Sequence, residues 1–419
     1  MAIVLFEGFE RPFNPDVWTL TRDPAQIADI LAGNGDPTGV IWGYSGRGPQ
    51  PSGGAYIGSH NNFNKATMVA VFPPQTGKTI YLGVGMSSLR AARQDENLGP
   101  ESRLPIISFR AANGAEQIVI GLEHSATDPT YDTFGAYALH VPTSTYAHYD
   151  IPALKAMSNI YDGVAVKPLE GPPNNNSFVY VEVEITANNT VAIRMDGQYL
   201  FTNGATAASF ASISPIAQIE FYSARIDSRF IDDMYLLNND GTAANSWLGM
   251  NTYVLPLHYP WPATVAEWTS VPEQSVVSNP ETGDSNVVPL TANDSDASYI
   301  STSTFPRTQL YQVTPSGNAY QGWNYFYDQT AVTGSRVLGM NFWTKARKTT
   351  QDSAYKFVYA PAASSTTTYD LSSSIPVTAI NYENKPIVYV DKNPATDAAW
   401  TIADIYTDGL FGVQSVNPT

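Results

Sequence analysis

The chain of 419 residues contains no cysteine, and this absence excludes several kinds of chemistry. No disulfide framework can stabilise the fold, and neither a thiolate metal site nor a cysteine nucleophile is available. Histidine is also scarce, and its spacing is not typical of a zinc site, since the five residues lie at positions 60, 124, 140, 148 and 258. The sequence therefore predicts no cofactor.

Basic residues are few, with 22 Lys and Arg against 38 Asp and Glu, which gives a formal net charge of -16. Recognition of nucleic acid or of an anionic membrane needs clustered positive charge. The densest basic segment holds only Lys345, Arg347 and Lys348. Nucleic acid and anionic membranes are therefore excluded as main partners.

Long apolar runs are absent as well. No stretch reaches the about 18 consecutive apolar residues that a membrane-spanning helix needs, so we expect no membrane insertion. The apolar run Met1–Phe6 is short, has no basic residues before it and meets Glu7 at once. This pattern is not typical of a signal peptide, and we expect synthesis in a cytoplasm.

The residues that are present suit large folded domains. Hydrophobic residues make up 43% of the chain, aromatic residues 12% and charged residues only 14%, which is enough apolar surface to bury large cores. A chain of this length exceeds one ordinary core and predicts two or three domains.

The stretch 178–250 shows the clearest pattern. Apolar residues alternate with others through Phe178–Ile185, a period of two that predicts a strand with its Val and Ile side chains in a core and Glu182 and Glu184 in water. Turn signals follow at Asn188-Asn189 and Met195-Asp196-Gly197. Further strand patterns predict an antiparallel meander, at 191–195, 219–222 and 230–237.

These motifs carry a resemblance. The strand 181–184, the hairpin 195–197 and the strand 231–233 resemble the last strands of laminin-G-like, or concanavalin A-like, jelly rolls. The segment Leu236–Gly241, followed by Asn245–Gly249, is similar to a junction in tailed-bacteriophage virion proteins, where a jelly roll precedes a smaller C-terminal β-domain.

The resemblance implies a structural protein of a phage tail or capsid exterior. Such a protein would work through contacts with other virion proteins, as a homo-oligomer, in a particle assembled in the host bacterial cytoplasm. One alternative is a receptor-binding or carbohydrate-adhesion protein that contacts a host surface glycan, and another is a capsid decoration protein. The third, from a different class, is a glycan-degrading enzyme.

The expected fold is all-β with very few short helices. It comprises a concanavalin A-like jelly-roll sandwich over 1–243, a Pro-rich linker over 244–265 and a smaller C-terminal β-sandwich over 266–419. Three prolines at 256, 260 and 262 favour extended backbone in the linker. The expected elements and connections are an Asn113-Gly114 hairpin, a surface loop over 33–56, short helices at 25–32 and near 400–405, C-terminal strands at 309–313, 337–346, 355–359 and 387–390, and an irregular end at 411–413.

The candidate chemical motifs are weak, and we expect no enzymatic activity and no catalytic residue. Glu182 and Glu184 would lie about 7 Å apart on one strand face, close to the separations used in glycoside hydrolysis. The strand lacks the central Asp of the jelly-roll glycosidase motif, so a solvated outer face is the preferred interpretation. Gly77-Lys78-Thr79 imitates the end of a P-loop, but Phe72 stands where that motif has its first glycine.

Calcium binding stays open. Laminin-G-like domains hold calcium in some cases, and hard oxygen ligands occur at Asp232-Asp233, Asn238–Gly241 and Asn293–Asp296. None has the spacing of an EF-hand, and turn formation by Asn and Asp explains such clusters more often than ions do.

A glycan contact is predicted at a loop edge and not on a sheet face. The glycine-rich segment 33–54 carries Trp42 and Tyr44, whose rings could stack on a sugar, and Arg47, which could donate hydrogen bonds to it. The alternative is that this loop packs on its own domain or on a neighbouring subunit.

Overall fold

A computed structural model of the chain divides it into two compact units, Met1–Val254 and Leu255–Thr419. The described residues are 3–8, 17–20, 39–45, 53–58, 67–87, 103–124, 134–150, 178–222, 229–240, 245–249, 252, 254, 257–258, 264–271, 299–303, 305–312, 314–315, 337–349, 351–362, 364–365, 367–406 and 409–416. Their regular secondary structure is almost entirely β-strand, in antiparallel sheets, which confirms the all-β prediction. Within these ranges, no helix is both long and apolar enough to cross a membrane.

The larger sheet of the first unit, sheet A, has nine strands in the described part of the chain. They are β1 (Ile3–Glu7), β3 (Gly39–Ser45), β4 (Gly53–Gly58), β6 (Ile80–Ser87), β11 (Phe178–Ile185), β12 (Thr190–Met195), β13 (Gln198–Tyr199), β14 (Ala207–Ser209) and β16 (Arg229–Asn238). Their order is β13-β12-β11-β6-β16-β4-β3, with β1 also paired to β16 and β14 to β12.

Sheet B, the second sheet of this unit, has seven described strands. They are β2 (Trp18–Leu20), β5 (Thr67–Val71), β7 (Arg103–Ala111), β8 (Glu116–His124), β9 (Phe134–His140), β10 (Thr145–Asp150) and β15 (Ile216–Tyr222). Their order is β10-β9-β8-β7-β15-β5-β2, with a single turn of 3-10 helix, Val141–Thr143, between β9 and β10.

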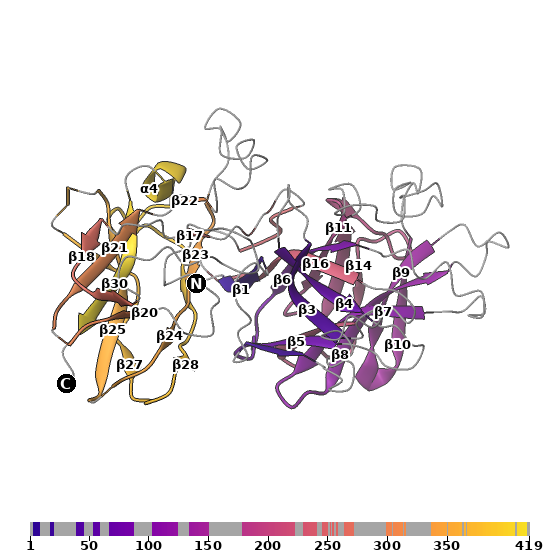
Figure 1. Cartoon of the computed structure of the whole chain (residues 1–419). Coiled ribbons are helices and arrows are strands. Elements are labelled where there is room, and N and C mark those ends of the chain that lie inside the picture. The colour runs from indigo at the N-terminus through magenta and orange to yellow at the C-terminus, as the bar shows by residue number, and fades with distance from the viewer. Residues whose placement is uncertain are drawn as a thin grey trace. The chain divides into compact units, whose positions relative to one another are not determined.

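The two sheets share one core (Figure 1). The inner face of each sheet carries fully buried apolar side chains, such as Val181 and Val183 in β11 and Ile118 and Ile120 in β8. Hydrogen bonds connect the sheets directly. The Trp18 indole donates to Glu7 at 3.3 Å, and the Tyr149 hydroxyl donates to the carbonyl of Val191 at 2.6 Å and accepts from the Ala208 amide at 3.2 Å. This two-sheet sandwich is the predicted jelly-roll class.

The predicted turn chemistry is confirmed at three hairpins. Gly114, which joins β7 to β8, has a φ of 81°, and Asn189, between β11 and β12, has a φ of 61°. Asp196 and Gly197 have φ values of 46° and 78° and lead into β13. Asn, Asp and Gly tolerate this left-handed region, so the sequence places these turns correctly.

The second unit contains a six-stranded sheet and several two-stranded pairs. Its strands are β17 (Leu257–His258), β18 (Val265–Ala266), β19 (Thr269–Val271), β20 (Tyr299–Ser301), β21 (Thr308–Gln312), β22 (Thr314–Pro315), β23 (Met340–Phe342), β24 (Lys345–Ala346), β25 (Ser353–Ala360), β26 (Tyr369–Asp370), β27 (Ile375–Val377), β28 (Glu383–Asn384), β29 (Val388–Val390) and β30 (Leu410–Val416). Phe342 of β23 packs against Phe357 and Phe411 of the six-stranded sheet, which gives this unit its own core.

Three sequence predictions are wrong. The expected loop over 33–56 includes the paired strands β3 and β4, because glycines in this stretch do not prevent main-chain pairing of its Val, Ile and aromatic residues. The expected irregular end at 411–413 lies within β30, which pairs with both β21 and β25 and buries Phe411. The expected strand 337–346 is divided into the short strands β23 and β24, which pair with different partners.

One predicted helix is present in a shorter form. Helix α4 spans Ile402–Tyr406 and begins after Thr401, whose hydroxyl accepts a hydrogen bond from the Asp404 amide at 3.1 Å. The Asp404 carboxylate accepts from the Thr401 amide at 2.8 Å, which completes a capping box. On this helix Ile405 is buried and Ala403 is exposed. The predicted helix over 25–32 lies outside the described residues.

Candidate functional site

Polar side chains gather on the outer face of sheet B. In β8 the residues Ile118, Ile120 and Leu122 are fully buried on the core side, so Val119 and Glu123 lie on the opposite side. The neighbouring strands follow the same alternation, and their outward residues form two separate polar clusters. We name them the arginine cluster and the edge cluster.

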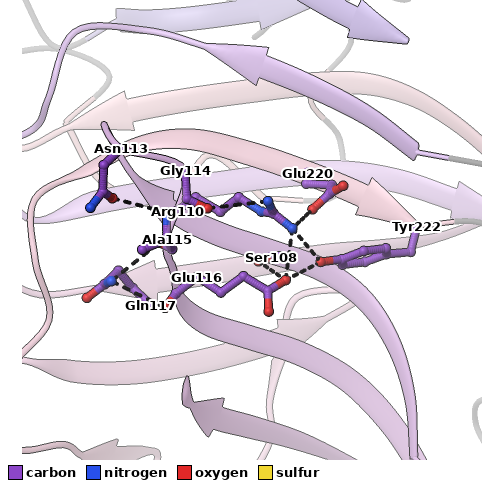
Figure 2. Close-up of polar contacts among 9 residues, drawn as sticks. All are labelled: Ser108, Arg110, Asn113, Gly114, Ala115, Glu116, Gln117, Glu220 and Tyr222. Carbon is purple, nitrogen blue, oxygen red and sulfur yellow. Dashed lines mark hydrogen bonds and ion pairs between the residues drawn. The ribbon is translucent and has the colours of Figure 1, made fainter. Parts of the chain in front are cut away.

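The arginine cluster consists of Ser108, Arg110, Glu116, Glu220 and Tyr222 (Figure 2). The Arg110 guanidinium lies 3.0 Å from Glu116 Oε1 and also pairs with the nearly buried Glu220. Glu116 Oε1 additionally accepts hydrogen bonds from the hydroxyls of Tyr222 and of Ser108, the latter at 3.1 Å. These contacts join β7, β8 and β15 across the sheet.

Electrostatics indicate that the arginine cluster is closed on itself. Burial and the hydrogen bond to Glu116 raise the pKa of the Tyr222 hydroxyl, so it stays a neutral donor. Burial lowers the pKa of Arg110, but its contacts with Tyr222, Glu220 and Glu116 outweigh this and raise it. Because the guanidinium pairs with both carboxylates, we assign this cluster a structural role, although Arg110 Nε is buried without a hydrogen bond.

The edge cluster lies at the other end of the sheet, where β10 is the last strand. It comprises Arg103 of β7, Glu123 of β8, and Tyr146, His148 and Asp150 of β10. Arg103 Nε donates to Glu123 Oε2 at 3.3 Å, and His148 Nδ1 contacts Glu123 Oε1. His148 Nε2 lies 3.0 Å from Asp150 Oδ1.

Aromatic rings complete the edge cluster. The Arg103 guanidinium stacks over the Tyr146 ring at 3.7 Å, and the Tyr137 ring of β9 lies 5.9 Å from that of Tyr146. Phe201 forms a main-chain bridge with Asp150, which places both side chains on the same side. Exposure is higher here than in the arginine cluster: 39% of Phe201 and 48% of the Arg103 side chain are accessible to solvent.

A missing side chain in β9 allows this arrangement. Gly135 stands between Glu123 and Asp150 in the strand register. A Cβ atom on Gly135 would lie only 2.5 Å from Cε1 of the His148 ring. The glycine therefore leaves the space in which the imidazole of β10 crosses β9 to reach the carboxylate of β8.

The edge cluster also shifts the pKa of His148. Burial alone would lower the pKa of His148, but hydrogen bonds and charge interactions with Glu123 and Asp150 outweigh it. The pKa of His148 is therefore raised above its ordinary value of 6.5. A protonated imidazole donates from both ring nitrogens, which suits a position between two carboxylates.

Two of the three residues predicted to contact a glycan lie in sheet A. Trp42 and Tyr44 are part of strand β3 and do not belong to a loop, and Arg47 lies outside the described residues. The glycan contact at these three residues stays a prediction. The sequence analysis missed the edge cluster, although Tyr146, His148 and Asp150 show the period of two that marks the outward face of a strand.

The prediction that Glu182 faces water is wrong. The residue is fully buried, because the segment Asn245–Gly249 lies over the outer face of sheet A at this point. Glu182 accepts hydrogen bonds from the Tyr235 hydroxyl and from the Gly249 amide. Glu184 is partly exposed, and burial raises its pKa against the opposing effect of a hydrogen bond from Tyr81. The two carboxylates therefore do not share an open surface.

The Asn and Asp clusters considered for calcium make turns and caps in the structure. Asp232 Oδ1 accepts a hydrogen bond from the Asp233 amide at 2.7 Å, and Asn238 Oδ1 accepts one from the Asp240 amide at 2.9 Å. Among the described residues, no group of three His, Asp or Glu side chains is arranged to hold a metal ion. Residues 293–296 are not described.

Comparison with known proteins gives no family. No protein-family model and no curated protein matches the chain. Among solved structures, the chain is similar to Cip1, a cellulose-induced protein, with 12% identity and a TM-score of 0.35 over 58% of this chain and 100% of that one. It is also similar to the Emp47p carbohydrate recognition domain, with 8% identity and a TM-score of 0.32 over 56% of this chain and 94% of that one.

A third similar structure is the binding domain of botulinum neurotoxin DC in complex with SialylT. Here the identity is 10% and the TM-score 0.29, over 88% of this chain and 74% of that one. At these levels of identity and TM-score, none of the three indicates what this chain binds.

Proposed function

We propose that this protein is a non-catalytic binding protein whose first unit holds a carbohydrate at the edge cluster. The observation that carries the proposal is one outward surface that presents the exposed Phe201 ring, the half-exposed Arg103 guanidinium and the exposed Asp150 carboxylate. The arginine cluster on the same sheet has similar residue types, but its side chains are less exposed, with 25% of Arg110 accessible against 48% of Arg103. The edge cluster is therefore the better candidate for a ligand.

The chemistry of a sugar fits these groups. The apolar face of a pyranose ring can stack on an exposed ring such as Phe201. Its hydroxyl groups can accept hydrogen bonds from the Arg103 guanidinium and donate to the Asp150 carboxylate. Asp150 is well exposed, at 72% of its side chain, and lies beside Phe201 through the main-chain bridge. One sugar could therefore touch the ring and the polar groups together.

Binding without turnover is favoured by the state of the carboxylates. Glu123 uses one oxygen for Arg103 and the other for His148, and Glu182 is buried beneath another segment. A glycosidase needs two carboxyl groups that flank an open site. Neither residue offers a free carboxylate to a sugar.

Binding to a glycan array, with affinities from calorimetry, tests this proposal. Phe201→Ala should weaken binding by about 1.5–3 kcal/mol, the burial value of a large apolar side chain. Arg103→Ala should weaken it by about 1.5–3 kcal/mol, the value of a hydrogen bond from a charged group, so each change is roughly tenfold to a hundredfold. Tyr199→Ala is the matched control, since Tyr199 is exposed to 38% but belongs to sheet A. Trp42→Ala and Tyr44→Ala test the site predicted from sequence.

Two results would contradict the proposal. One is a wild-type protein that binds no glycan. The other is binding that Phe201→Ala and Arg103→Ala leave unchanged while the fold is intact. If Trp42→Ala abolishes binding instead, the ligand lies at β3.

We further propose a place for this binding protein, on the exterior of a tailed-phage particle as a tail or capsid-surface component. The support is the sequence similarity of 236–249 to the junction of such virion proteins. Mass spectrometry of purified particles should find the protein, and its copy number would distinguish a tail device, with few copies, from a capsid decoration, with many. Absence from particles would contradict this location but not the binding function.

A further inference from the structure

The last residues of the first unit form a strap over the outer face of sheet A. We define the strap as Asn245–Gly249 together with Thr252 and Val254. It follows β16 and leads directly to the second unit, which begins at Leu255. The proposed carbohydrate site on sheet B does not involve it.

A buried carboxylate, that of Glu182, accepts a hydrogen bond from the strap. Oε1 of Glu182 accepts hydrogen bonds from the Gly249 amide at 2.8 Å and from the Tyr235 hydroxyl at 2.5 Å. The Tyr235 hydroxyl in turn accepts one from the Leu248 amide at 3.1 Å. Two successive amides of the strap are thus bound, directly or through one tyrosine, to Glu182.

Burying the Glu182 carboxylate costs desolvation free energy, which its contacts must offset. The residue is 0% exposed, and its second oxygen lies 3.6 Å from the Arg194 guanidinium. A buried carboxylate is tolerated only where donors and an opposite charge compensate for the lost water. Here the strap supplies one of those donors, so the carboxylate and the strap depend on each other.

Two glycines, Gly83 and Gly249, make the contacts between the strap and Glu182 sterically possible. Gly83 pairs with both Glu182 and Tyr235, and a Cβ atom on it would lie 2.2 Å from the Tyr235 ring. Its missing side chain lets that ring lean across β6 toward the carboxylate. Gly249 has a φ of 86°, a left-handed conformation that most other residues adopt only with strain.

The rest of the strap packs between aromatic side chains. The Trp247 ring lies edge-on to Tyr81 at 5.7 Å and to Tyr199 at 6.1 Å, and the Arg194 guanidinium lies 5.0 Å from it. Further along, the Val254 amide donates to Asp233 Oδ1 at 2.7 Å. The strap is therefore bound at several points along the sheet.

We propose that this segment is a latch, in which Glu182 holds the strap closed and thereby fixes the point where the chain leaves the first unit. Opening the latch would uncover Tyr81, Arg194 and Tyr199 on sheet A and would lengthen the free chain before the second unit. The device is specific to one side chain, because the partly exposed Glu184 two residues away bonds Tyr81 instead of the strap.

Amide hydrogen exchange of the full chain tests the latch. In Glu182→Ala, the Leu248 and Gly249 amides should exchange about tenfold to a hundredfold faster, as expected for loss of a charged hydrogen-bond acceptor. The amides of Val183 and Ile193 in the underlying strands should keep their protection. Glu184→Gln is the matched control and should leave the strap amides unchanged.

A second variant covers the case in which Glu182→Ala does not fold. Gly249→Ala strains the strap backbone and leaves every residue of sheet A in place, so it should speed exchange at Leu248 in the same way. Unchanged exchange at Leu248 in a folded Glu182→Ala or Gly249→Ala protein would overturn the proposal. Equally fast exchange in Glu184→Gln would overturn it too, because the effect would then not belong to Glu182.

Discussion

At the scale of single residues, His148 makes the stability of the first unit depend on pH. Its pKa in the folded protein is raised above 6.5, whereas the unfolded chain has the ordinary value. The folded state therefore binds the proton more tightly. The stabilisation is fully present below the unfolded pKa and is lost as the pH rises through the folded pKa.

We expect the wild-type free energy of unfolding to fall as the pH rises above about 6.5, and to fall less in His148→Gln. Denaturant unfolding at a series of pH values measures this difference. Asp150→Asn should give an intermediate slope, because it removes one of the two carboxylates and leaves Glu123. A pH dependence identical in wild type and His148→Gln would show that the edge cluster does not hold a charged imidazole.

At the scale of elements, the packing of β6 against β16 in sheet A requires a glycine at position 83. Gly83→Ala in β6 would place a methyl group 2.2 Å from the Tyr235 ring, and the ring would have to move away from Glu182. We expect a loss of about 1–3 kcal/mol of stability, the usual cost of overpacking. Denaturant unfolding measures this loss. Gly114→Ala is a control for the loss of a glycine, since that turn has open space around it but a left-handed φ. A Gly83→Ala protein as stable as wild type would mean that Tyr235 can reach Glu182 by another path.

The strands of the first unit were largely predictable because each one carries its own signal. A period of two and an Asn or Gly turn are local, and they place β11, β12 and the hairpin at Gly114 correctly. Strand β30 was missed for the opposite reason. Phe411-Gly412-Val413 is short and contains glycine, and only its two neighbours in the sheet make it a central strand.

The site was not predictable from local signals. The edge cluster joins residues of the four consecutive strands β7 to β10 with Phe201, which comes from a distant part of the chain, and only the sheet order brings them together. Glu182 shows a second limit. The period of two correctly places it on the outer face of β11, but it does not reveal that the strap covers that face.

At the scale of the whole molecule, the chain holds two separate cores. The second unit buries its own aromatic cluster, in which the Tyr359 ring lies 5.0 Å from both Trp400 and Phe411. The first unit has its own core, which lies between sheets A and B. Each core is large enough for cooperative unfolding of its own unit.

This separation predicts two thermal unfolding transitions, one for each unit. Two matched glycine substitutions can show which transition belongs to which unit. Gly412 of β30 faces β21 so closely that a Cβ atom would lie 1.8 Å from the carbonyl oxygen of Gln309, and Gly412→Ala must therefore push the two strands apart. In differential scanning calorimetry, Gly412→Ala should lower the temperature of one transition and leave the other in place. Gly83→Ala should do the reverse, because its clash with Tyr235 lies wholly within the first unit. If either substitution moves both transitions together, the two units unfold as one cooperative body.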